Sequence, residues 1–126
     1  MNKIKDNRGY KQRGMIYQPS DLNRLKMHVN ETLDHWITKA ILFRILRKMK
    51  HDVITEFEIT GMGIGDIFDL TTSVQYEVET TSHSKFLQRR KGDYSRDGVE
   101  IIVIPLARLP EDMKGREKEL EGWVWG

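Results

Sequence analysis

Two stretches of the chain alternate between different kinds of side chain, and this pattern limits the fold more than any other feature. In residues 53–60 (VITEFEIT) and 74–81 (VQYEVETT), apolar side chains or threonine recur at every second position. A period of two is typical of a β-strand whose two faces lie in different surroundings. Glycines at 61, 63 and 65 end the first stretch, GDIFDL resumes an extended segment, and residues 71–73 can form a tight turn. We therefore expect a meander of strands at 53–60, 66–71 and 74–81.

The remaining segments predict helices around this meander and one more strand. Apolar residues recur at three- and four-residue steps over 31–50, which indicates an amphipathic helix. The unbroken apolar run at 101–104 suits a strand at 99–106 that is buried on both faces. Short helices are expected at 84–91, which is basic, and at 111–121. The fold class is α/β, with a mixed central β-sheet flanked by helices in the order α-β-β-β-α-β. Residues 1–19 are expected to form a basic N-terminal arm, and residues 20–126 a single domain.

Composition excludes several classes of site. The chain has no cysteine, so disulfides, thiolate zinc sites and cysteine nucleophiles are excluded. No apolar run approaches the ~20 residues that a membrane span needs, and the basic start lacks the apolar region of a secretory signal. We expect an intracellular, cytoplasmic protein. Residues 1–50 hold twelve Lys and Arg against four acids, whereas residues 51–126 hold nine against fifteen, a split that suggests an anionic partner for the basic half.

Three acids are expected to converge within the meander. Glu77 and Glu79 lie two apart on a strand and share a face. With the turn at residues 71–73, Asp66 falls almost opposite them on the neighbouring strand. Carboxylates this close repel one another unless a cation lies among them, and Mg²⁺ prefers oxygen ligands. Asp69 has the opposite parity along its strand, so we expect it to cap the turn rather than join this group.

These residues resemble the motif of the PD-(D/E)xK nuclease superfamily, whose members share a restriction-endonuclease-like core. Asp66, which follows Gly65, matches the first acid of the motif, and Glu77-Val78-Glu79 matches the (Asp/Glu)-x-Lys element. Ten residues separate the two parts, and the order of elements is similar over residues 30–106. Glutamate stands at position 79 where the superfamily usually has lysine.

The resemblance implies a DNA nuclease that depends on Mg²⁺ or Mn²⁺ and acts as an endonuclease rather than an exonuclease. It implies that Asp66, Glu77 and Glu79 are metal ligands and catalytic residues, and that an acid from the first helix joins them. Glu31 is the matching candidate for that acid, and Glu56 is the competing one. Basic residues near the acids are expected to bind DNA phosphates, namely Lys85, Arg89, Arg90 and Lys91, with Lys39 on the first helix. A homodimer is expected, because cutting two strands calls for two sites.

Two other functions remain open from the sequence. The same fold could bind nucleic acid without cutting it, because the usual lysine is missing. Alternatively, the chain could be a small interaction protein that dimerises through its apolar strand or its terminal tryptophans. Divalent-cation-dependent cleavage of DNA would separate the nuclease from both alternatives.

Overall fold

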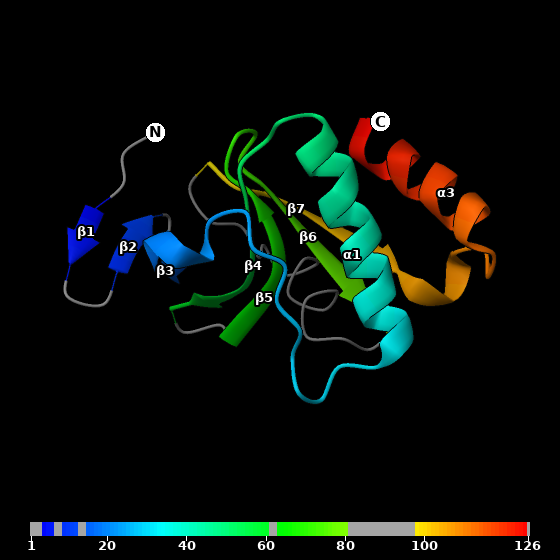
Figure 1. The fold of residues 1–126 in the computed structure, drawn as a ribbon, viewed down its shortest axis with the longest axis horizontal. Coiled ribbons are helices and arrows are strands. Elements are labelled where there is room, and N and C mark those ends of the chain that lie inside the picture. The colour runs from blue at the N-terminus through cyan, green and yellow to red at the C-terminus, as the bar shows by residue number, and fades with distance from the viewer. Residues whose placement is uncertain (1–3, 7–8, 13–14, 61–62, 81–97, 126) are drawn as a thin grey trace.

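A seven-stranded sheet forms the centre of the computed structural model, which describes residues 4–6, 9–12, 15–60, 63–80 and 98–125, with side chains from residue 15 onward. The strands follow one another across the sheet in chain order (Figure 1). All neighbouring strands are antiparallel except the last two, which are parallel. The strands are β1 Ile4–Asp6, β2 Gly9–Gln12, β3 Met15–Tyr17, β4 Val53–Ile59, β5 Gly63–Asp69, β6 Val74–Glu79 and β7 Glu100–Pro105.

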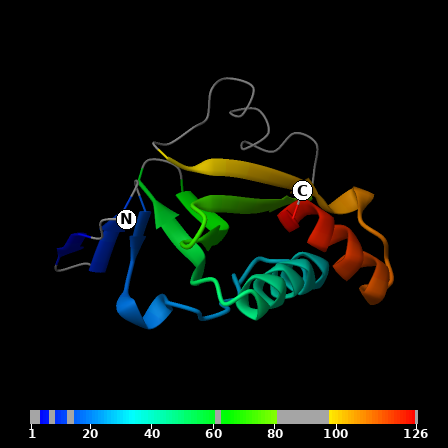
Figure 2. The ribbon, with the colours of Figure 1, turned by 90° about the horizontal axis from the view of Figure 1, so that it is seen from above.

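Two α-helices in the described part of the chain cover one face of the sheet (Figure 2). Helix α1 spans Leu33–Lys48, and Thr32 caps its N-terminus by accepting a hydrogen bond from the backbone N–H of His35. Helix α3 spans Met113–Trp125 and packs beside α1. Short 3₁₀ helices occupy Pro19–Asp21 and Leu106–Arg108.

The apolar residues form two clusters, one on each face of the sheet. The cluster beneath the helices joins α1 and α3 to residues of β4 to β7, including Leu42, Ile67 and Leu120. The other cluster includes Phe57 and Phe68, whose rings meet edge to face at 5.9 Å. Strand β7 contributes to both clusters, which confirms the prediction that it is buried on both faces.

The predicted α/β class with a mixed sheet is confirmed, and the expected strands and two of the expected helices are present. Strand β5 begins at Gly63, earlier than predicted, because the glycines pair with the end of β4 instead of breaking the sheet. The turn at residues 71–73 is confirmed, with the Ser73 N–H donating to the Asp69 carbonyl at 2.8 Å. The expected helix at 84–91 lies outside the described residues.

The sequence predicted no strand before residue 20, yet three strands lie there. Strand β3 pairs with β4, with Met15 opposite Ile59. Met15 and Tyr17 are buried in the core, so burial of these two side chains attaches the segment to the sheet. Neither described α-helix is long and apolar enough to cross a membrane.

Candidate functional site: an acidic cleft between strands β4 to β6 and helix α1

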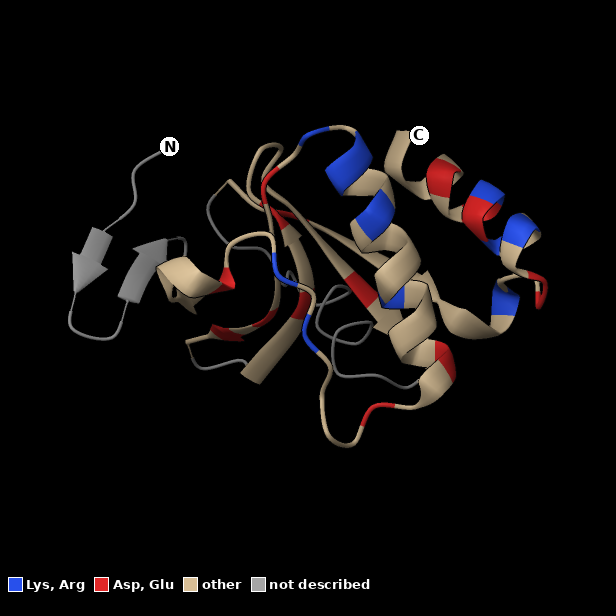
Figure 3. Cartoon of the chain, viewed as in Figure 1, with Lys and Arg blue, Asp and Glu red and all other residues tan. Residues whose placement is uncertain are grey.

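Acidic residues of three neighbouring strands fall in one row across the sheet. Glu56 of β4 lies opposite Asp66 of β5, between ladder pairs on either side. The β5–β6 ladder ends at the pair Ile67–Tyr76, and the next two residues in register are Asp66 and Glu77. Figure 3 shows acidic positions on β4, β5 and β6. The pairing of the strands therefore brings together carboxylates that are far apart in the sequence.

Strand β4 is distorted at this row. Ile54 and Phe57 belong to the same core cluster although they are three residues apart, a separation that places side chains of a regular strand on opposite faces. The change occurs at Glu56, whose φ of 48° lies in the left-handed region. Gly65 is the strand partner of Phe57, and a Cβ added at Gly65 would lie 2.4 Å from the Phe57 ring, so only glycine lets that ring enter the core there. The distortion lets the Glu56 carboxylate reach helix α1, where it contacts Lys39.

Strands β5 and β6 are joined at this point by side chains instead of a regular ladder. The Glu77 carboxylate accepts a hydrogen bond from the backbone N–H of Asp66 at 2.9 Å. In return, the Asp66 carboxylate accepts one from the backbone N–H of Val78 at 2.8 Å. The Gln75 side-chain amide donates to the same oxygen of Glu77 at 3.1 Å. These crossed contacts hold the two carboxylates next to each other.

Glu77 is a buried acid without a cationic partner close to it in the described residues. Its residue exposure is 1%. Burial and the negative charge of Asp66 raise the pKa of Glu77 well above its ordinary value, and the charge of Glu79 adds to this effect. Hydrogen bonds from Asp66 and Gln75 act in the opposite direction without cancelling the rise.

Helix α1 and the turn before it bring three further charged side chains to the acids. The three residues, Glu31, His35 and Lys39, are spaced four positions apart in the sequence and therefore lie on one side of the helix. The Lys39 ammonium is fully buried and lies 2.9 Å from Glu31 and 2.8 Å from Glu56. Burial raises the pKa of Glu31, but hydrogen bonds from Lys39, the His28 backbone and His35 outweigh this and leave it below its ordinary value.

The His35 ring connects the helix to the strands. Its Nδ1 contacts Glu31, and its Nε2 lies 2.9 Å from the Val78 carbonyl and 3.3 Å from Asp66. Burial lowers the pKa of His35, but the hydrogen bonds and charges of Asp66 and Glu31 outweigh this effect and raise the pKa to about 9. His35 is therefore a cation at neutral pH.

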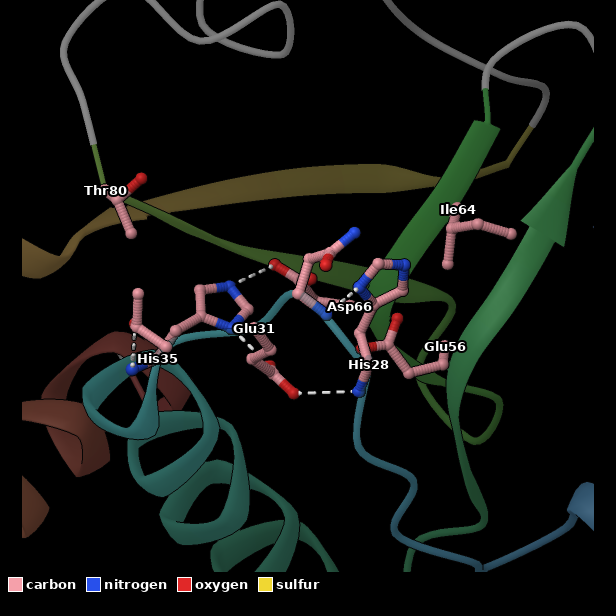
Figure 4. A pocket seen from close by; sticks show the side chains of 9 residues that line it. His28, Glu31, His35, Glu56, Ile64, Asp66 and Thr80 are labelled. Carbon is pink, nitrogen blue, oxygen red and sulfur yellow. Dashed lines mark hydrogen bonds and ion pairs between the residues drawn. The ribbon is translucent and has the colours of Figure 1, made fainter.

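A cleft of about 310 Å³ opens over these groups. Figure 4 shows the His35 ring between the side chains of Glu31 and Asp66. The residues that line the cleft are His28, Asn30, Glu31, Thr32, His35, Glu56, Ile64, Asp66 and Thr80.

The predicted acids are partly brought together. Asp66, Glu31 and Glu56 all line the cleft, so the two acids proposed as competitors, Glu31 and Glu56, are both present. Glu77 contacts Asp66 but is not among the lining residues. Glu79 lies half-buried at the end of β6 and is also not among them.

Asp69 lies apart from this group, as its parity along the strand predicted. Its carboxylate accepts hydrogen bonds from the backbone N–H groups of Thr71 and Thr72, and it pairs with His51 at 2.7 Å. The expected turn-capping role of Asp69 is confirmed.

The expected DNA-contacting role of Lys39 needs correction. Its side chain is buried between Glu31 and Glu56 and does not reach the surface that a polyanion would contact. The other basic residues expected to bind DNA, Lys85, Arg89, Arg90 and Lys91, lie outside the described residues. Sequence reasoning missed the ion pair between Lys39 and Glu56 of β4, because the four-residue spacing of Glu31, His35 and Lys39 indicates only that these three side chains share one side of the helix.

No three histidine or acidic side chains among the described residues are arranged closely enough to hold a metal ion. The side chains of Asp66 and Glu77 instead accept hydrogen bonds from backbone N–H groups of the neighbouring strand.

No family model, curated protein or solved structure matches the chain.

Proposed function

We propose that this protein is a nuclease that hydrolyses DNA phosphodiester bonds with the help of a divalent cation, Mg²⁺ or Mn²⁺, held by Asp66 and Glu77. The observation that carries the proposal is the buried Glu77 carboxylate, which accepts a hydrogen bond from the backbone N–H of Asp66 on the neighbouring strand. An endonuclease that works as a homodimer inside the cell is the form of this activity that we propose.

The charges around the cleft favour a cation. Glu31, Glu56 and Asp66 line the cleft and Glu77 contacts Asp66, and among the described residues only Lys39 and His35 oppose these four carboxylates. With every group ionised, the formal charge of this set is −2, the amount that one divalent ion neutralises. A phosphate group would be repelled from a cleft of this charge, whereas the same cleft with a bound cation would attract it.

The donor atoms also suit a hard cation. Mg²⁺ and Mn²⁺ prefer carboxylate and carbonyl oxygens and can be held by one or two carboxylates with water completing the shell. Beside Glu77, the Oε1 atom of the buried Gln75 has no hydrogen-bond partner among the residues that the structure describes. Acceptor oxygens thus outnumber donors on this part of β6, and a cation between Asp66 and Glu77 would relieve the repulsion that raises the pKa of Glu77.

A bound cation of this kind polarises a phosphate oxygen and lowers the pKa of a coordinated water. The protein's own residues would orient the ligands. His35, charged at neutral pH, neutralises Asp66 and contacts the Val78 carbonyl on β6. Lys39 holds Glu31 and Glu56 in place. Glu79 follows Glu77 on the same strand and is proposed as a further ligand or a base toward water.

The place of the basic segment in the sequence supports DNA as the substrate. Thr80 lines the cleft, and Lys85, Arg89, Arg90 and Lys91 follow it closely in the sequence. We propose that these four side chains contact phosphates on either side of the scissile bond, which would give salt-sensitive binding with little sequence preference.

The test is cleavage of supercoiled plasmid in Mg²⁺, in Mn²⁺ and in EDTA, where a closed circle reports endonuclease activity alone. The wild type should nick the plasmid in either metal and not in EDTA, and Asp66→Ala should remove the activity. Glu58→Ala is the matched control, because Glu58 is an exposed acid on β4 outside the cleft. A wild type that cuts neither duplex, branched nor single-stranded DNA would refute the nuclease, and DNA binding without cleavage would indicate the binding module instead.

A further inference from the structure

Large apolar side chains are exposed beside the cleft. Met27, Val29 and Leu33 are 59%, 90% and 65% exposed, and in the sequence each stands next to a residue that lines the cleft. Ile64 lines the cleft itself and is 45% exposed, and Figure 4 shows it across the cleft from His35. Single exposed apolar side chains are ordinary, but a group of them beside one cleft marks a binding surface. We call these four side chains the apolar rim.

Hydrogen bonds brace the segment that carries most of the rim. The Lys26 backbone N–H donates to the Thr55 hydroxyl of β4 at 2.9 Å, which ties the chain to the sheet just before Met27. A turn follows, in which the Glu31 N–H donates to the His28 carbonyl at 3.0 Å. The Glu31 carboxylate in return accepts a hydrogen bond from the His28 N–H at 3.1 Å. The side chains beside the cleft are therefore presented by a turn that is fixed at both ends.

The charge of the same part of the chain favours a polyanion as the occupant of the rim. Residues 1–30 hold seven Lys and Arg against two acids. Arg24 is exposed and precedes Met27 by three residues. Figure 3 shows basic positions on the loop that leads to α1. A basic protein segment would be repelled by these cations, whereas nucleic acid offers phosphates to them and apolar base faces to the rim.

Paired and unpaired bases differ in what they offer to an apolar side chain. In a paired duplex the base faces are stacked on one another, and phosphates and sugars form the outer surface. An unpaired base leaves the stack at a smaller cost in free energy, and its face is then open to contact. Met, Leu and Ile side chains are among those that proteins insert between unstacked bases. The rim therefore suits DNA whose bases are not all paired.

We propose that the apolar rim contacts the faces of unpaired bases beside the cleft, so that the substrate class is DNA with unpaired nucleotides next to the scissile bond. This inference rests on the proposed function for the choice of DNA. Its own subject is the contact with bases, which can be measured without cleavage.

The experiment compares two DNA probes by fluorescence anisotropy in EDTA with the full chain. One probe is a fully paired duplex, and the other is the same duplex with a short bulge of unpaired nucleotides. The wild type should bind the bulged probe about tenfold more tightly than the paired one. With 2-aminopurine in the bulge, binding of the wild type should raise its fluorescence, because the base leaves the stack.

The double variant Met27→Gln with Val29→Thr tests the rim. Both side chains are exposed and both replacements have similar shapes, so the circular dichroism spectrum should match that of the wild type. The variant should bind the paired duplex as the wild type does, but it should lose most of the preference for the bulge and most of the rise in fluorescence. Met113→Gln is the matched control, because Met113 is an exposed methionine of α3 outside the lining of the cleft, and it should behave as the wild type.

The inference and the proposed nuclease fail in different ways. Plasmid cleavage by a wild type that binds bulged and paired probes equally would overturn the inference and leave the nuclease. A preference for the bulge that depends on Met27 and Val29, without cleavage in Mg²⁺ or Mn²⁺, would support the inference and refute the nuclease. An unchanged preference in the double variant would overturn the inference. So would a change from dimer to monomer in sedimentation of the double variant, which would assign the rim to contact between two copies of the chain.

Discussion

Replacing Glu77 with glutamine tests whether the negative charge of this carboxylate destabilises the folded protein. Glu77 is buried, and burial together with the charge of Asp66 raises its pKa. Glutamine has the same shape and can still accept the hydrogen bond from the Asp66 backbone N–H. The substitution removes one negative charge from the cluster and leaves the packing of β6 in place.

The expected change in stability follows from the direction of the pKa shift. A raised pKa means that the folded protein binds this proton more tightly than the unfolded chain. The wild type should therefore lose stability as the pH rises through the unfolded-state pKa, near the ordinary value of 4.5, until it passes the folded-state pKa. Above that window the stabilisation from the bound proton is lost in full. Weaker hydrogen bonds to the neutral amide offset about 1 kcal/mol of the benefit of removing the charge, so Glu77→Gln should be as stable as the wild type or more stable at pH 8.

Urea unfolding in EDTA at a series of pH values from 4 to 8 measures this difference. The gain should shrink toward pH 4, where Glu77 of the wild type is protonated in both states. Glu58→Gln, on the exposed side of β4, should stay within about 0.5 kcal/mol of the wild type. A loss of several kcal/mol by Glu77→Gln at pH 8 would refute the reasoning, because it would show that Glu77 is ionised and paired with a cation. Mn²⁺ should stabilise the wild type and not Glu77→Gln.

Three other perturbations address the parts that hold the cleft together. In EDTA, the stabilising contribution of His35 should be complete below its unfolded-state pKa of 6.5 and should disappear as the pH rises through about 9. NMR titration of the His35 ring measures the folded-state pKa. The variant His35→Gln should lack this pH dependence of stability. Gly65→Ala should lower the stability by about 1–3 kcal/mol, because its Cβ would meet the Phe57 ring. Gly122→Ala in α3, where an added Cβ meets nothing within 4 Å, should raise the stability by about 0.5–1 kcal/mol. Urea unfolding compares the two variants. Arg116→Met should lower the stability by about 2 kcal/mol or more in the same assay. The buried Arg116 side chain joins α3 to Asp34 and Thr38 of α1, and it also donates to the Pro110 carbonyl.

The positions of the central strands and helices could be predicted from the sequence because they depend on local periodicity. Alternation located β4 and β6, and the three- and four-residue repeat located α1. Strands β1 to β3 carry no such signal. Strand β3 belongs to the fold through its pairing with β4, about forty residues away, and through burial of Met15 and Tyr17. Contacts of this range cannot be read from a short window of sequence.

The candidate site was predictable only as far as strand parity allowed. Parity correctly separated Asp69 from Asp66 and placed Asp66 next to Glu77. It could not show that β4 changes its pleat at Glu56, because this depends on the fit of the Phe57 ring over Gly65. The sequence left Glu31 and Glu56 as alternatives, whereas the structure joins both through Lys39.

Among the described residues, the positive charge beside these acids comes from helix α1 and not from the strand that carries Glu77. In the PD-(D/E)xK superfamily, whose motif these residues resemble, a lysine usually stands two residues after the second acid. Here that position is Glu79. Lys39 and His35 approach the acids from the opposite side of the cleft instead. The charge of the cleft therefore depends on how α1 is seated on the sheet, and α1 is itself tied to α3 through Arg116. A substitution that shifts α1 should change ion binding even when every carboxylate is retained.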